Sequence, residues 1–141
     1  MYQNILVGAD GSETARRAVE TAAELAGTLK ATLHIVSAFE TKDAPSGAYK
    51  SEEKLHAAES EVAALLQDLS FVAAKYGVDV VTHSELGDPV DVVVYFADQV
   101  GADLVVVGNR GMQGIRRVLG SVPNSVAHKA PCSVLIVETS E

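Results

Sequence analysis

The sequence predicts a single α/β domain, residues 1–141, in which an open sheet of five parallel strands carries helices on both faces. Five short apolar runs, typical of buried strands, alternate with segments of helical periodicity, and this alternation is the pattern of a covered parallel sheet. A chain of 141 residues suits one domain with a core of its own. Hydrophobic residues at 48% and charged residues at 21% exclude an intrinsically disordered chain.

The first part of the chain predicts two strands joined by a helix. The apolar run at residues 4–9 is followed by residues typical of a turn, and it predicts a buried strand. Apolar side chains recur at helical spacing over residues 13–29, and Ser12 stands where an N-cap belongs. Residues 32–39 form the second apolar run, and the Pro-Ser-Gly sequence within residues 40–50 indicates a loop.

The middle of the chain predicts two helices around a third strand. Apolar residues step by three and four over residues 55–76, and Gly77 ends this helix in the manner of a C′ residue. Residues 78–86 read as a strand. Residues 90–100 contain valines that favour a strand by propensity. Because Asp88 supplies an N-cap, a proline follows it, and the apolar residues share one face, we expect a helix there.

The last part of the chain predicts two strands, a loop and a helix. Residues 104–107 are a fully apolar strand, and residues 108–120 are a glycine-rich loop. A helix follows to about Lys129, and residues 132–137 form the fifth strand.

Charge and cysteine content exclude several classes of protein. The 11 basic and 19 acidic residues give a net charge of −8, which argues against a surface that holds nucleic acid or anionic lipid. The lone Cys132 excludes a disulfide framework and a cysteine-based zinc site, and it favours a reducing, cytoplasmic location. Neither a signal peptide nor a run long enough to span a membrane is expected. We therefore expect no membrane and no nucleic-acid partner.

The histidines and the cysteine predict no metal site. His34 and His83 fall in strands, while His56 and His128 fall in helices, and none of them has a partner at the spacing of a ligand motif. Cys132 opens the fifth strand, where we expect a packed apolar group.

Candidate ligand positions follow from the sheet itself. Open parallel sheets bind ligands at the carboxyl ends of their strands, where the strand order reverses. Three segments come directly after strands: residues 9–12, residues 37–39 and residues 108–111. We expect a site at one of these ends or where they meet.

The glycine-rich loop is the most informative of the three segments. Glycines let backbone N–H groups approach a phosphate, and Gly120 and Ser121 lead into a helix start that favours an anion. No acidic residue occurs between Leu104 and Val137. The basic residues of this stretch are Arg110, Arg116, Arg117 and Lys129. A protein of charge −8 thus keeps one long stretch suited to an anion.

These residues give the chain a family resemblance over essentially its whole length. The opening strand with Asp10 and Ser12, the Gly-Asp-Pro after the third strand, and the closing block from residue 105 to residue 137 resemble the universal stress protein family. Gly108, Gly111 and Gly120 with Ser121 match that family's motif Gly-x2-Gly-x9-Gly-[Ser/Thr], except that eight residues rather than nine separate the second and third glycines. The departure concerns the path of the segment near residues 115–118.

The resemblance implies a Rossmann-like, adenine nucleotide alpha hydrolase-like fold with strand order 3-2-1-4-5. It implies that Asp10 lies near the ribose hydroxyls, that Ala38 lines the adenine pocket, and that Val122 follows the phosphate site as an apolar wall. Members with an asparagine at the position of Asn109 resemble a subset in which some bind cyclic AMP. The expected nucleotide-binding residues are Asp10, Ala38, Gly108, Asn109, Arg110, Gly111, Gly120, Ser121 and Val122.

Three functions remain open from the sequence. The first is a stress-response regulator that binds ATP, ADP, AMP or cyclic AMP, with Mg²⁺ if the ligand is ATP, and acts on an unknown protein partner. The second is a slow ATP hydrolase, but no P-loop, base or second metal-binding carboxylate stands near the loop, so no catalytic residue is assigned. The third is a ligand-free protein that acts through dimer contacts. The resemblance implies a homodimer through antiparallel pairing of the last strands, residues 133–137.

Overall fold

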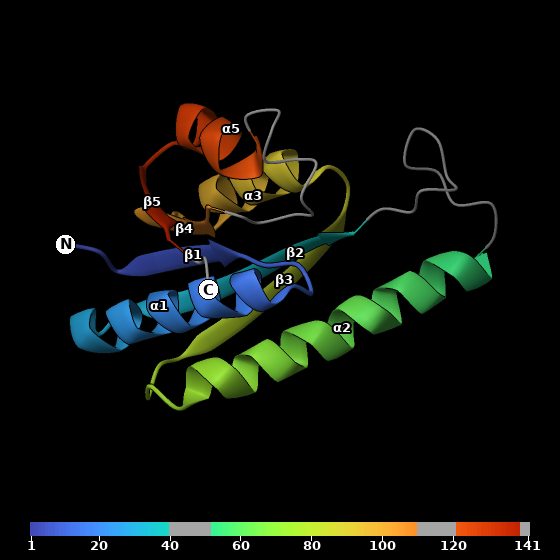
Figure 1. The fold of residues 1–141 in the computed structure, drawn as a ribbon, viewed down its shortest axis with the longest axis horizontal. Helices are drawn as coiled ribbons and strands as arrows, with labels where there is room; N and C mark the ends of the chain where they lie inside the picture. The colour runs from blue at the N-terminus through green and yellow to red at the C-terminus, as the bar shows by residue number, and fades with distance from the viewer. Residues whose placement is uncertain (40–51, 110–120, 139–141) are drawn as a thin grey trace.

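The computed structural model describes residues 1–39, 52–109 and 121–138. Five parallel strands form one sheet in the order β3-β2-β1-β4-β5, which confirms the expected order 3-2-1-4-5 (Figure 1). The strands are β1 (Asn4–Gly8), β2 (Thr32–Phe39), β3 (Val80–Leu86), β4 (Leu104–Gly108) and β5 (Ser133–Val137). The helices are α1 (Glu13–Leu29), α2 (Glu52–Ala74), α3 (Pro89–Gln99) and α5 (Ser121–Lys129).

The helices form one layer on each face of the sheet. Figure 1 shows α1 and α2 on one side and α3 and α5 on the other. An apolar core lies on each face of the sheet, and successive side chains of a central strand belong to opposite cores. Ile5 and Val7 of β1 pack with α1 and α2, whereas Leu6 packs with α3 and α5. Because both faces of β1 and β4 are covered, these strands are apolar except for Asn4 at the start of β1.

Side-chain caps explain where two of the helices begin. The Ser12 hydroxyl accepts a hydrogen bond from the Ala15 N–H at 3.1 Å, which confirms Ser12 as the N-cap of α1. The Asp88 carboxylate accepts hydrogen bonds from the N–H groups of Val90 and Asp91 at 3.0 and 3.3 Å. Since this cap precedes a proline in the first turn, the valine-rich segment is a helix despite its strand propensity, as expected.

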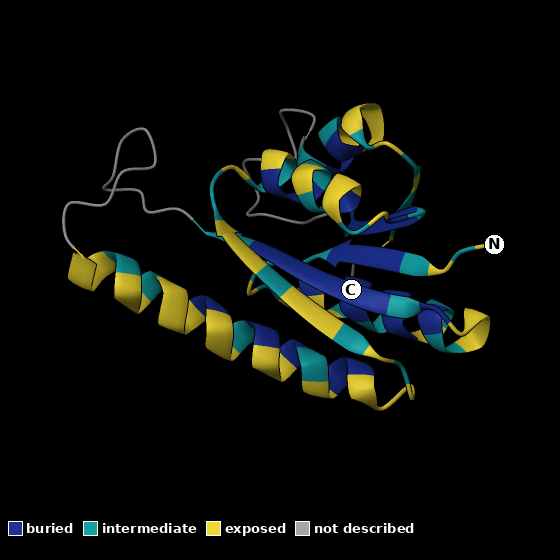
Figure 2. Ribbon diagram, turned by 180° about the vertical axis from the view of Figure 1, so that it is seen from behind, coloured by how far each residue is buried: buried dark blue, intermediate teal, exposed yellow. Residues whose placement is uncertain are grey.

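The sheet has two exposed edges, β3 and β5. Of the seven residues of β3, four are exposed, three are half-buried and none is buried (Figure 2). The strand begins at Val80 rather than at residue 78, and the Asp79 carbonyl just before it accepts the Leu33 N–H at 2.9 Å, which begins the pairing of β3 with β2. The expectation that every strand is buried therefore holds for the centre of the sheet only.

Helix α2 is longer than its buried face. Residues 52–61 contain no buried side chain, and the helix runs past the ends of the strands there (Figures 1 and 2). The buried residues are Val62, Leu66, Leu69, Val72 and Ala73. The predicted core stripe from Leu55 to Tyr76 is thus correct only in its middle: Leu55 is only half-buried, and Tyr76 follows the helix and is 39% exposed.

Candidate functional site

The carboxyl ends of β1, β2 and β4 meet at the point where the strand order reverses. β1 pairs with β2 on one side and with β4 on the other. The Ala9 N–H donates to the Val36 carbonyl at 2.9 Å, so the β1–β2 pairing continues to the end of β1 and directs Asp10 toward the level of Ala38. Gly108 ends β4 on the other side. The structure therefore brings Asp10, Ala38, Gly108 and Asn109 to one edge of the sheet, where such folds bind ligands.

Asp10 is held by the turn that follows β1. Its Oδ1 accepts a hydrogen bond from the Ser12 N–H at 2.8 Å, and Ser12 in turn caps α1. The carboxylate is half-buried. One of its oxygens thus closes an Asx-turn, and this turn fixes the carboxylate at the start of α1.

Asn109 is tied to the end of β5. Its backbone N–H donates to the Val137 carbonyl at 2.8 Å, and its side-chain Nδ2 donates to Oε1 of Glu138 at 3.3 Å. The backbone N–H of Asn109 is therefore used by the sheet and not by a ligand. Sequence reasoning missed Glu138, which stands just past the stretch without acidic residues. It could have been found from the strand order, because the ends of β4 and β5 lie side by side.

Helix α5 begins at the same edge. Since β4 and β5 are parallel, the helix that joins them must run back across the sheet, so its N-terminus, Ser121, lies at the carboxyl edge. The first N–H groups of a helix and its dipole favour an anion. Val122 is half-buried and packs with the apolar cluster under α3 and α5.

Some predicted site residues lie outside the described residues. These are Arg110, Gly111 and Gly120, together with the loop in which the motif departs by one residue. The site as described therefore consists of Asp10, Ala38, Gly108, Asn109 and the start of α5.

A groove of about 420 Å³ lies elsewhere, between α2 and β3. It is lined by Ala63, Leu66, Gln67, Ser70, Phe71, Thr82, His83 and Ser84. Its walls supply hydroxyl and amide groups but neither Lys, Arg nor a helix N-terminus for an anion. For that reason we assign the candidate site to the strand ends and not to this groove.

Two histidines that lie far apart in the sequence are paired in the structure. His34 Nδ1 lies 3.0 Å from His83 Nε2, although 49 residues separate them. Each histidine looks isolated in the sequence, and only the pairing of β2 with β3 brings them together. Burial lowers the pKa of both imidazoles, and His83 lowers the pKa of His34 further. No group of three His, Cys, Asp or Glu side chains suited to a metal occurs within residues 1–39, 52–109 and 121–138.

Cys132 is a half-buried thiol at the start of β5. It packs with the apolar cluster under α3 and α5, as expected. Burial raises the pKa of the Cys132 thiol, and the carboxylate of Asp103 raises it further. Both effects keep the sulfur protonated and poorly nucleophilic at neutral pH.

Comparison with known proteins identifies the family. The model of the universal stress protein family matches residues 1–138. The chain belongs to the universal stress protein family. A universal stress protein of Mycobacterium tuberculosis strain H37Rv is 39% identical over 144 residues, which span 99% of this chain and 98% of the relative. None of the described helices combines the length and apolar character that crossing a bilayer demands.

Two solved universal stress proteins carry adenine nucleotides. One, crystallised in complex with cAMP, is 37% identical, with a TM-score of 0.78 over 99% of this chain and 98% of that chain. The other, from Archaeoglobus fulgidus in complex with dAMP, is 26% identical, with a TM-score of 0.73 over 97% of this chain and 98% of that chain. Both agree with the fold described above.

Proposed function

We propose that the protein is an adenine-nucleotide-binding regulator whose ligand sits at the carboxyl ends of β1, β2 and β4. The observation that carries the proposal is its likeness, over 99% of its length and at 37% identity, to a universal stress protein in complex with cAMP. The described residues supply matching chemistry. Asp10 offers a carboxylate for a ribose diol, and the start of α5 offers N–H groups for a phosphate.

Among adenine nucleotides, we propose that a monophosphate such as cyclic AMP is preferred to ATP. Glu138 places a carboxylate beside Asn109, at the end of β4 where the phosphate motif begins. A triphosphate carries more negative charge than a cyclic monophosphate and is repelled more by that carboxylate. A cyclic monophosphate also needs only one anion site and no Mg²⁺, whereas ATP is usually bound with a metal.

The proposal includes a homodimer formed through β5. This strand is at the edge of the sheet, and the side chain of Ile136 is 44% exposed. An exposed edge strand pairs readily with another chain, and antiparallel pairing of two copies of β5 across a two-fold axis would cover both edges. We include a reducing cytosol in the same proposal, because the lone cysteine, Cys132, has no need of a compartment that forms disulfides.

The first experiment is to identify what the purified protein carries. The protein is denatured, and the released small molecules are measured by liquid chromatography and mass spectrometry. The protein freed of ligand is then titrated with cyclic AMP, AMP, ADP and ATP, the last with and without Mg²⁺, by isothermal titration calorimetry. We expect cyclic AMP to bind most tightly. If none of the four binds at millimolar concentration, the proposed function is wrong.

A further inference from the structure

Three polar side chains form a hydrogen-bonded row across neighbouring strands on the face covered by α3. Asn4 of β1, His34 of β2 and His83 of β3 take part. The two rings are inclined by 20°, with centroids 5.2 Å apart, while their nearest nitrogens are 3.0 Å apart. The rings thus meet edge to edge and nearly in one plane, which is the arrangement of an N–H···N hydrogen bond.

The row fixes which ring nitrogens carry hydrogen. Oδ1 of Asn4 can only accept, so the His34 Nε2–H donates to it at 3.3 Å. A neutral His34 is then bare at Nδ1 and accepts the Nε2–H of His83. His83 in turn is bare at its own Nδ1. The hydrogen bond from His34 to Asn4 therefore fixes the direction of the hydrogen bond from His83 to His34. The neutral pair has one defined set of tautomers.

The pair can take up one proton without loss of its hydrogen bond but cannot take up two. A first proton on Nδ1 of His83 leaves the Nε2–H donation to His34 intact. A second proton must go to Nδ1 of His34, the atom that accepts that bond, and two N–H groups would then face each other at 3.0 Å. Two positive rings would also stand side by side where His34 is 8% exposed. The doubly charged pair is incompatible with the closed arrangement.

Among the described residues, none around the pair carries a buried charge that would offset two protonated rings. Phe96 of α3 covers the His83 ring at a centroid distance of 4.8 Å, and Tyr95 packs edge-on against Phe96. The charged or titratable groups on the elements packed around the pair lie at its borders: Asp79 and Glu85 by β3, Asp91, Tyr95 and Asp98 on α3, and Asp103 beside Asn4. All except the half-buried Asp103 are exposed. Asp103 accepts the backbone N–H groups of Gln3 and Asn4 and is engaged there.

We propose that the His34–His83 pair is an acid-operated latch that holds β3 and α3 against the centre of the sheet. The neutral or singly protonated pair keeps it closed, and the second proton opens it by breaking the bond between β2 and β3 side chains. The opened element is the edge strand β3 together with α3, which touches it through Phe96. The latch belongs to the fold and does not depend on the nucleotide proposed above.

The test is a histidine titration of the intact protein by NMR, read together with amide hydrogen exchange. Long-range ¹H–¹⁵N spectra are recorded from pH 8 to pH 4.5, and His56 and His128, the exposed histidines of α2 and α5, serve as internal references. At pH 8 we expect both His34 and His83 as Nε2–H tautomers. On acidification we expect one proton to be taken up first with β3 still protected, and protection in β3 and α3 to fall about tenfold per pH unit with the second.

Variants separate the latch from general acid sensitivity. His83→Gln keeps an N–H donor near the position of Nε2 but takes up no proton, so the pH-dependent loss of protection in β3 should disappear. His56→Gln and His128→Gln should leave it unchanged. Independent titration of His34 and His83 near the ordinary pKa of about 6.5, or equal protection of β3 at pH 7.5 and at pH 4.5, would overturn the proposal. Both readouts come from the unmodified chain, so they decide the matter even if His83→Gln does not fold.

Discussion

The side-chain amide of Asn109 donates a hydrogen bond to the carboxylate of Glu138, 3.3 Å away, across the carboxyl ends of β4 and β5. In the structure, an acidic side chain therefore lies beside the stretch that has no acidic residues in the sequence. This carboxylate stands beside the first glycine of the motif, Gly108. The carboxylate of Glu138 therefore lies next to the candidate site on the side of β5.

Glu138→Gln should raise the affinity for ATP more than the affinity for cyclic AMP. Glutamine keeps an oxygen that accepts from Asn109 but removes the charge, and relief of an exposed charge contact is worth up to about 1 kcal/mol, or about fivefold in affinity. Calorimetric titration at low and moderate salt measures the effect, which should shrink as salt rises. Glu85→Gln, which removes another exposed carboxylate, on β3, is the control. A uniform gain for all ligands would contradict a role of Glu138 in selectivity.

Asp10→Asn should weaken nucleotide binding by about 1–3 kcal/mol, the range for losing hydrogen bonds to a charged group. Asparagine retains the oxygen that accepts from the Ser12 N–H, so the turn is preserved. Ser12→Ala provides the matched control, because it removes the cap of α1 and costs about 1 kcal/mol of stability without removing the carboxylate. If both variants bind nucleotide equally weakly, Asp10 acts through the turn alone.

Gly27→Ala should destabilise the fold by about 1–2 kcal/mol. A Cβ at Gly27 would stand 2.8 Å from the backbone carbonyl oxygen of Tyr76, and that oxygen cannot rotate away as a side chain could. The clash outweighs the helix propensity that alanine gains over glycine, roughly 1 kcal/mol. Urea denaturation measures the loss. Gly11→Ala, where a Cβ meets nothing within 4 Å, should change the unfolding free energy by less than about 0.5 kcal/mol.

Ile136→Lys should convert the proposed dimer into a monomer. A charge on the exposed face of an edge strand discourages pairing between two copies. Light scattering coupled to size-exclusion chromatography gives the mass directly. Tyr95→Lys is the matched control, since Tyr95 is also a large exposed side chain, at 52%, but lies on α3. A dimer that survives Ile136→Lys and dissociates with Tyr95→Lys would place the interface on α3 instead.

The elements with strong local signals could be predicted from the sequence. Ser12 and Asp88 each satisfy the first N–H groups of a helix, and that local chemistry outweighs the strand propensity of the valines in α3. The ends of α2 are predicted less accurately from the sequence. Its acidic first turn, Glu52 and Glu53, starts the helix before any apolar residue does, so apolar spacing alone places the start at Leu55.

Contacts between strands could not be predicted in the same way. The pairing of His34 with His83 and that of Asn109 with Glu138 both depend on which strands are neighbours and on their register. Strand order came from the family resemblance, and no local spacing in the chain encodes it. The sequence pattern overestimates the burial of β3 for a related reason. Whether a strand lies at the edge of the sheet depends on the strand order, and the amino-acid composition of the strand indicates it only weakly.

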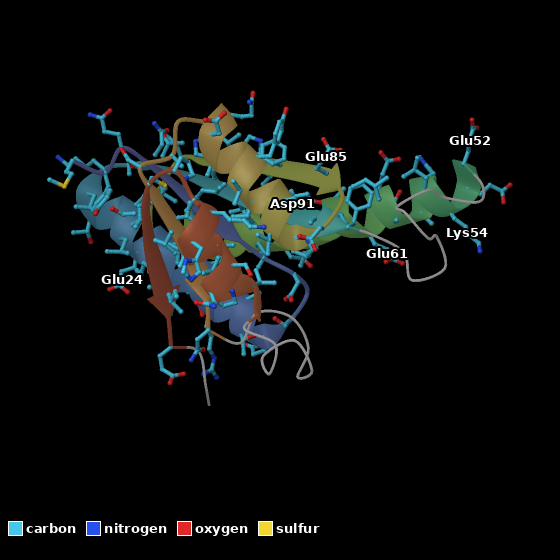
Figure 3. All side chains as sticks on the ribbon, turned by 90° about the horizontal axis from the view of Figure 1, so that it is seen from above. Glu24, Glu52, Lys54, Glu61, Glu85 and Asp91 are labelled. Atoms are coloured by element: carbon cyan, nitrogen blue, oxygen red, sulfur yellow. The ribbon has the colours of Figure 1, made fainter. Side chains whose placement is uncertain are left out.

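The overhang of α2 places a group of acidic side chains beside the carboxyl edge of the sheet. The exposed first turns of this helix carry Glu52, Glu53, Glu59 and Glu61 against the single Lys54, and they project beyond the strands on the face of α1 and α2 (Figure 3). An incoming anion meets a repulsive field on that flank. The flank of α3 and α5 presents the N-terminus of α5, although the start of α3 there also carries the exposed carboxylates of Asp88 and Asp91. Under the proposed function, the start of α5 is the described element of this edge that attracts an anionic ligand, so we expect the association rate to depend on ionic strength.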